Sequence, residues 1–112
     1  MTTIKSNSGN ENVANDLYVQ LAGVTLSAGT YLLIGYTNFQ STSSTGSRIS
    51  RFVASDYTSL DLEVMPNTQG YTQIKNIELV TLSSSKTIYI QAKQLSGNTM
   101  SVSGQIKAIK LG

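Results

Sequence analysis

The residues that could carry out chemistry in this chain are few, and those that most enzymes depend on are absent. The 112-residue sequence contains no histidine and no cysteine. It therefore lacks the commonest general base and metal ligand, together with every triad of the Ser-His-Asp or Cys-His type. A disulfide framework and a thiolate metal site are excluded for the same reason. The sequence predicts a protein that is not an enzyme and that needs neither cofactor nor metal.

The acidic residues Asp61 and Glu63 come closest to a hydrolytic site, because glycosidases place two carboxyl groups on either side of the scissile bond. They alternate with Leu60, Leu62 and Val64, and residues two apart lie on one face of a β-strand. Any half-buried strand produces such a pair of acids on its solvated face. We interpret the pair in this way and rank a glycosidase last among the possible functions.

Several polar and aromatic residues near the loops have the side chains that a saccharide site needs. Such sites place an aromatic ring against the C–H side of a sugar and use Asp, Asn or Arg groups for its hydroxyls. Asp56 beside Tyr57 is the clearest combination of this kind. The alternative is ordinary solvation of loops and packing at sheet edges. The candidate ligand-binding residues are Arg48, Arg51, Asp56, Tyr57, Asn67 and Tyr71.

Charge and aromatic residues do not favour a nucleic-acid partner. Eight basic residues face six acidic ones, and the basic residues are scattered from Lys5 to Lys110. A nucleic-acid surface needs several cations on one face, interleaved with exposed rings. The rings here lie within the most apolar segments, so we predict that they pack in the core or in an interface. These aromatic residues are Tyr31, Tyr36, Phe39, Phe52 and Tyr89.

The sequence also predicts no membrane insertion. The longest apolar run covers only residues 31–34, far below the roughly 20 residues that cross a bilayer. The first ten residues lack the apolar region of a secretory signal. Serine and threonine supply 29 of the residues and only 12% are charged. Because such hydroxyl-rich, nearly neutral surfaces are common outside cells and on virions, we expect a virion or extracellular location.

The elements that would position these residues are strands throughout. β-Branched and aromatic residues alternate with polar ones, Gly, Ser and Asn punctuate the runs, and no helical period is sustained. We predict seven to eight short strands in an all-β, two-sheet antiparallel β-sandwich, with a possible bulge near Phe52 and Val53. Residues 1–16 are polar and are predicted to be a flexible N-terminal arm, with one domain over residues 17–112. The predicted strands lie within residues 17–26, 30–39, 48–54, 56–64, 71–82, 86–95 and 100–111.

Three segments resemble a known family in their order and spacing. They are SAGTYLLIG at residues 27–35, LSSSKTIYIQA at residues 82–92 and IKAIKLG at residues 106–112. Together they resemble the tumour necrosis factor-like jelly roll of complement globular heads and of the head domains of bacteriophage tail fibres and receptor-binding proteins. The resemblance spans about residues 17–112. The chain departs from the family in being short and in having no shaft or stalk before the head.

The resemblance implies a ten-stranded jelly roll that assembles as a homotrimer, with one sheet of each subunit facing the threefold axis. In that arrangement Tyr89 and Gln91 point away from Ile88 and Ile90, toward neighbouring subunits. The implied function is a non-catalytic trimeric head of a phage tail fibre or receptor-binding protein that adheres to a host-surface saccharide. The alternatives are a structural virion protein, such as a capsid decoration or baseplate component binding other viral proteins, and a bacterial surface or spore-coat adhesin of the same fold.

Overall fold

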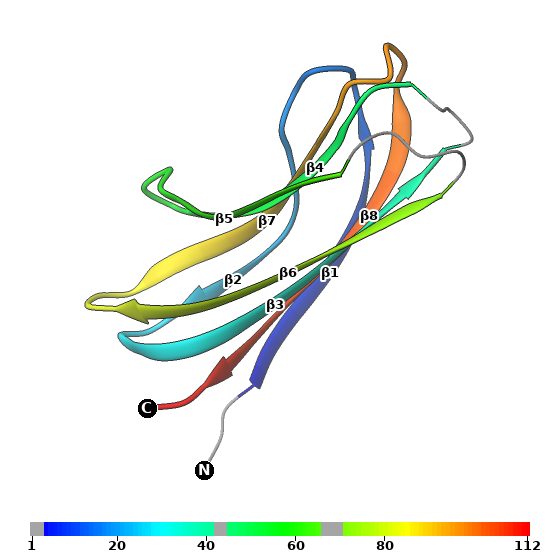
Figure 1. Ribbon diagram of the computed structural model, residues 1–112. Helices are drawn as coiled ribbons and strands as arrows, with labels where there is room; N and C mark the ends of the chain where they lie inside the picture. Colours follow the sequence, from blue (N-terminus) through cyan, green and yellow to red (C-terminus); the bar gives the residue numbers. More distant parts are fainter. Residues whose placement is uncertain (1–3, 42–44, 66–70) are drawn as a thin grey trace.

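The computed structural model describes residues 4–41, 45–65 and 71–112, without the side chains of residues 61 and 65. Every regular element in these segments is a β-strand, and none of them contains a helix that could cross a bilayer. Figure 1 shows the strands as two stacked layers. The strands are β1 (Ile4–Val13), β2 (Val19–Leu26), β3 (Gly29–Gln40), β4 (Arg48–Ala54), β5 (Ser59–Met65), β6 (Thr72–Leu82), β7 (Lys86–Gln94) and β8 (Met100–Lys110).

The two layers are four-stranded antiparallel sheets. Sheet A has the strand order β1-β8-β3-β6, and sheet B has the order β2-β7-β4-β5. Most connections cross from one sheet to the other, which is the jelly-roll topology. The predicted two-sheet antiparallel sandwich of jelly-roll topology is therefore confirmed. The described residues form eight strands, so the ten strands implied by the family resemblance are corrected.

Strand β1 contradicts the expected flexible arm. Each residue from Ile4 to Val13 pairs with β8, at one edge of sheet A. Main-chain hydrogen bonds hold a polar strand as well as an apolar one, because they do not depend on the side chains. Val13 anchors the strand end, since it is fully buried and its carbonyl oxygen accepts a hydrogen bond from Gln94 Nε2 at 2.9 Å. The prediction of an arm is wrong for residues 4–13.

The core lies between the sheets and follows the predicted alternation. Phe39 and Leu33 face inward from sheet A, and Phe52 faces inward from sheet B. Gly35 lies at a close approach of the two sheets, because a Cβ atom there would stand 2.8 Å from both Phe52 and Ile90. The prediction that aromatic rings pack in the core is confirmed for the buried rings of Tyr31, Phe39 and Phe52.

Two β-bulges change which residues reach the core. The register shifts between Phe52 and Val53, as the sequence predicted, and the extra residue is Leu60 on β5, which packs against the core. A one-residue bulge moves all following side chains to the opposite face. Leu62 and Val64 therefore point outward and are exposed, so the prediction that they share a face with Leu60 is wrong.

Candidate functional site

The predicted ligand-binding residues do not come together. Strands β4 and β5 form a hairpin with Asp56 and Tyr57 in its turn. Arg48 begins β4, and Tyr71 precedes β6, at the opposite end of the sandwich. Asn67 lies outside the described residues. The loops therefore supply single residues at separate places rather than one saccharide site.

The prediction that Arg48 is a ligand-binding residue on the surface is wrong. Its side chain is fully buried, with 0% exposure. Nη1 donates hydrogen bonds to the main-chain oxygens of Thr45 at 3.1 Å and of Gly46 at 3.3 Å. Burial lowers the pKa of the guanidinium from its usual value. Arg48 thus ties down the chain entering β4 and is not accessible to a ligand.

Arg51 lies on the outer face of sheet B and is held on three sides. Its Nε donates to Gln91 Oε1 at 2.9 Å, its Nη1 donates to Ser59 Oγ at 3.2 Å, and its guanidinium lies 3.5 Å from the centroid of the Tyr18 ring. Gln91 does point away from Ile90, as expected, but it is only 7% exposed beneath this cluster. Its amide is used within the chain, so its predicted role in a subunit interface is corrected.

Tyr89 also lies on the outer face of sheet B and is half-buried. Its ring crosses Gly23 on the neighbouring strand, where a Cβ atom would be 2.6 Å from Tyr89 Cδ1. The half-exposed ring is compatible with a contact to another subunit, and this role of Tyr89 stays a prediction.

Asp56 stabilises the β4–β5 turn. Its carboxylate accepts hydrogen bonds from Lys86 Nζ at 2.9 Å and from the main-chain N–H of Thr58 at 3.1 Å. The Lys86 hydrogen bond is the main reason that the pKa of Asp56 falls to about 2, and the Thr58 bonds add to it. The next residue, Tyr57, has a positive φ of 66° and is 84% exposed.

We expect Asp56→Asn to destabilise the protein at neutral pH but not in strong acid. The pKa of Asp56 is lower in the folded chain than in the unfolded one, so the ionised group stabilises the fold above about pH 4 and this contribution is lost as pH falls through about 2. Thermal unfolding of both proteins from pH 6 to pH 2 measures the difference in Tm, which should shrink with pH. Glu11→Gln, at an exposed residue of β1, is the control. A difference in Tm that stays constant with pH contradicts this role.

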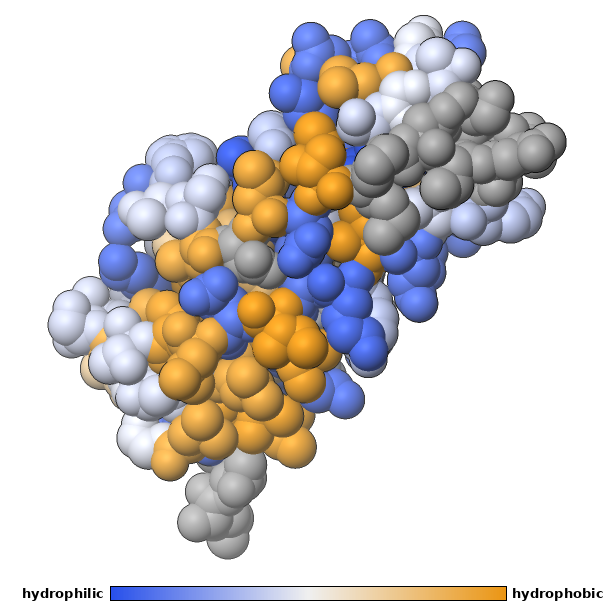
Figure 2. Space-filling model, in the orientation of Figure 1, coloured by the Kyte–Doolittle hydropathy of each residue, from blue (hydrophilic) through white to orange (hydrophobic). Residues whose placement is uncertain are grey.

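The outer face of sheet A is apolar at one end. Residues that oppose one another across the four strands form rows on this face, and the first two rows carry six large aliphatic side chains. Figure 2 shows hydrophobic residues gathered over the end of the molecule where β1 begins and β8 ends. We call this surface the apolar end, and it consists of Ile4, Ile109, Leu32 and Leu79 in the first row and Ile34 and Ile77 in the second.

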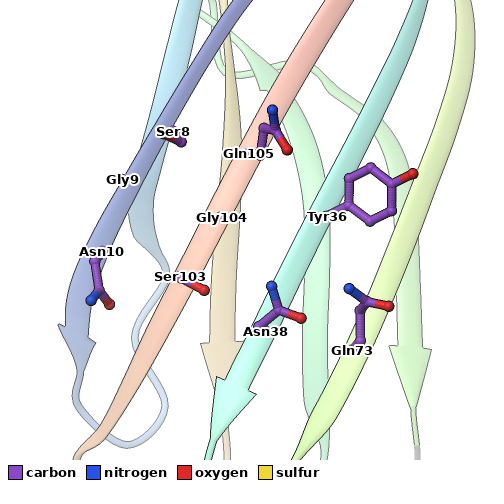
Figure 3. Close-up of a pocket in the computed structure, with 9 residues that line it drawn as sticks. All are labelled: Ser8, Gly9, Asn10, Tyr36, Asn38, Gln73, Ser103, Gly104 and Gln105. Atoms are coloured by element: carbon purple, nitrogen blue, oxygen red, sulfur yellow. The ribbon is translucent and has the colours of Figure 1, made fainter.

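The other end of the same face is polar and hollowed. The third row is Ser8, Gln105, Tyr36 and Lys75, and the fourth is Asn10, Ser103, Asn38 and Gln73. Figure 3 shows side chains of both rows projecting from one side of four neighbouring strands. They surround a hollow of about 620 Å³. We call it the polar hollow, and it is lined by Ser8, Gly9, Asn10, Tyr36, Asn38, Gln73, Ser103, Gly104 and Gln105.

Two glycines explain why the sheet is hollowed there. Gly9 and Gly104 oppose each other on β1 and β8, with their inner sides against Leu21, the extra residue of a bulge in β2. A Cβ atom on Gly9 would overlap the carbonyl oxygen of Leu21, and one on Gly104 would stand 2.6 Å from Leu21 Cδ1. Only residues without side chains allow so close an approach. We attribute the depth of the polar hollow to this approach of β1 and β8 to β2.

Sequence reasoning missed the polar hollow. The amides of Asn10, Asn38, Gln73 and Gln105 come from four strands that are distant in sequence, and β1 was expected to be an arm. Two signals were present. Polar residues recur at period two within apolar segments, and Gly104 interrupts a strand, which is typical of a close approach by another backbone.

The described residues of the polar hollow can bind a ligand through hydrogen bonds. No cluster of three or more His, Cys, Asp or Glu residues occurs in the part of the chain that the structure describes. Glu63 is exposed on β5, and the Asp61 side chain lies outside the described residues. The residues of the polar hollow are uncharged amides, hydroxyls and one phenol, with glycines between them.

Comparison with known proteins connects the chain to its fold through structure alone. No protein-family model matches the sequence, and no curated protein is similar to it. The globular domain of a zebrafish complement 1qA protein is 13% identical, with a TM-score of 0.64 over 94% of each chain. A protein of Bacillus endospore appendages, described as disulfide-linked pili, is 10% identical, with a TM-score of 0.58 over 97% of this chain and 87% of that one.

A protein of infectious bursal disease virus, Gx strain, is 12% identical, with a TM-score of 0.57, and the match covers 97% of this chain but only 32% of the viral one. None of these three proteins is described as an enzyme. At these identities the likeness concerns the fold and not the activity. The strand order, the two sheets and the match to the complement globular domain together show that this chain has a jelly-roll fold like that of the complement 1q globular domain.

Proposed function

We propose that the chain is a non-catalytic, self-associating head, active as a homotrimer, that attaches a phage tail fibre or a related virion or extracellular structure to a host-surface saccharide. The observation that carries the proposal is the apolar end of sheet A. Leu79, Ile4 and Ile77 are each more than half exposed, at 62%, 59% and 57%. They lie on the two edge strands of the sheet, and the half-buried Ile109, Leu32 and Ile34 fill the strands between them. Soluble monomers rarely keep a large contiguous apolar patch in water unless a partner covers it.

A second copy of the chain is the partner that fits this surface best. Apolar area removed from water contributes roughly 25 cal/mol per Å², without requiring a particular charge pattern in the partner. Copies of one chain can close a symmetric ring in which each subunit turns its apolar end toward the common axis. The chain has no cysteine, so it cannot form the disulfide links described for the Bacillus appendages, and association must depend on packing. The resemblance to tumour necrosis factor-like heads implies three copies.

We expect Leu79→Asp to dissociate the trimer while the sandwich stays folded. The substitution places a carboxylate within the proposed contact, where burial of an unpaired charge is costly, but Leu79 is exposed in the single chain. Light scattering should show the mass of one chain instead of three. Leu62→Asp is the matched control, because Leu62 is 54% exposed on the outer edge strand of the other sheet.

The same experiment separates the two faces. A trimer that survives Leu79→Asp, or a wild-type protein that is monomeric, contradicts the proposed contact. Dissociation by Tyr89→Glu with Leu79→Asp still trimeric would instead place the contact on sheet B, around the half-buried Tyr89 ring.

A structural role in a virion is the second candidate, in which the same head binds other viral proteins as a capsid decoration or baseplate component. The likeness to a segment of the infectious bursal disease virus protein favours it. The two roles predict different partners. Attachment of the labelled trimer to intact host cells supports adhesion, and specific capture of capsid or baseplate subunits without attachment to cells supports the structural role.

A further inference from the structure

We propose that the polar hollow binds a neutral saccharide. The inference rests on the adhesive role proposed above and names the site for it, on the outer face of sheet A, away from the loops that the sequence favoured. Its lining comes from adjacent positions of all four strands of that sheet, so the backbone holds the binding groups in place before a ligand arrives (Figure 3). Sites on strands are positioned more accurately than sites on loops.

The amides of the hollow are available to a ligand. Within the described part of the chain, the side-chain amides of Asn38, Gln73 and Gln105 make no hydrogen bond to another residue. Asn10 uses one bond, since its Oδ1 accepts from Ser101 Oγ at 3.2 Å. A side-chain amide offers two hydrogen-bond donors and an oxygen acceptor, and a serine hydroxyl can both donate and accept. Sugar hydroxyls also donate and accept, so each can pair with either kind of group.

The absence of charge from the lining selects a neutral ligand. All nine lining residues are uncharged. Lys75 is the nearest cation along the third row, and its Nζ lies 5.2 Å from the centroid of the Tyr36 ring, outside the lining. A purely apolar ligand would strip water from these polar groups without replacing its hydrogen bonds, which is unfavourable. The Tyr36 ring supplies the apolar surface that the C–H side of a sugar contacts.

The polar hollow is separate from the proposed subunit contact. Its two rows follow the apolar rows along the strands, and neighbouring rows on one face lie about 7 Å apart. A trimer that closes through the apolar end can therefore leave the polar end open to a saccharide. Three such sites on one head would strengthen a weak single-site affinity through multivalency.

The test uses the full chain and a set of neutral trisaccharides built from glucose, galactose, mannose and N-acetylglucosamine, with a sialylated trisaccharide as the anionic comparison. We expect at least one neutral probe to shift the NMR signals of the side-chain amides of Asn38, Gln73 and Gln105. Asn38→Ala should weaken binding of that probe about tenfold, because Asn38 lies in the middle of the hollow. Gln73→Ala provides a second variant in case Asn38→Ala fails to fold.

Gln40→Ala is the matched control, since Gln40 is an exposed amide on the same strand and face, one row beyond the hollow. It should leave binding within about twofold of wild type. Absence of binding by every neutral probe, preference for the sialylated probe, or binding unchanged in both hollow variants overturns the site. Amide signals that shift with protein concentration but not with sugar show that a second copy covers the hollow, which also overturns it. Light scattering on the same samples reports the trimer independently.

Discussion

Gln94→Leu is expected to lower the free energy of unfolding by about 3 kcal/mol or more, because one buried amide satisfies three main-chain groups at the rim of the sandwich. Gln94 Nε2 donates to the carbonyl oxygen of Val13 at 2.9 Å and to that of Asn98 at 2.5 Å. Its Oε1 accepts from the N–H of Ser96 at 2.7 Å. Gln94 is fully buried, so water cannot easily replace these bonds.

Leucine has nearly the volume of glutamine and fills the same space. The decrease in the free energy of unfolding therefore reports the lost hydrogen bonds rather than the cost of a cavity. Each buried polar group left without a partner costs about 1–3 kcal/mol. The effect should also be local. Val13 ends β1, and release of its carbonyl should raise amide hydrogen exchange in β1 before the rest of sheet A opens. Urea unfolding gives the free energy, and exchange measured by NMR gives the location.

Gln94→Glu distinguishes hydrogen bonding from packing by its dependence on pH. An ionised carboxylate could accept from Ser96 but would face the oxygens of Val13 and Asn98 without a proton to donate. The introduced carboxyl should therefore have a raised pKa in the folded chain. The variant should be most stable below about pH 4 and lose stability as pH rises from there through that raised pKa. Equal stability of both variants and wild type at pH 7 would contradict the account.

The strands with strong alternation could be predicted from the sequence, and so could the sandwich. The alternation of Ile88, Ile90 and Ala92 in β7 needs only the period of two, and all three side chains are buried as that period requires. The order of the predicted strands also matched the jelly roll, because the turn residues between them are clear.

Three features could not be predicted because they depend on contacts between distant segments. Ile4–Val13 looked disordered, since its pairing with β8 uses main-chain groups that leave no trace in hydropathy. Leu60 and Leu62 differ in burial only through a bulge. The polar hollow joins residues from β1, β3, β6 and β8, and its members look in sequence like any solvated strand positions.

Gly9→Val is expected to destabilise the protein by about 2 kcal/mol or more, although valine is one of the residues that strands prefer. A glycine in a strand costs stability relative to other residues unless its bare backbone is needed. At Gly9 it is needed, because a Cβ atom would overlap the carbonyl oxygen of Leu21, and a backbone atom cannot rotate away. Strand β1 must then move away from β2, which would also remove Ser8 and Asn10 from the polar hollow.

Ser6→Val is the matched control, since Ser6 lies on the same strand, is exposed on the outer face and does not line the hollow. Strand propensity alone predicts that both substitutions leave the free energy of unfolding unchanged or raise it. The close approach of β1 to Leu21 predicts instead that Gly9→Val lowers it while Ser6→Val does not. Chemical denaturation measures the free energies of unfolding, and titration with the neutral trisaccharide measures the affinity of the polar hollow. Gly9→Val should lose stability and saccharide binding together, while Ser6→Val keeps both. A stable Gly9→Val protein would mean that β1 does not depend on close contact with the Leu21 bulge, and that the hollow is not formed by this approach.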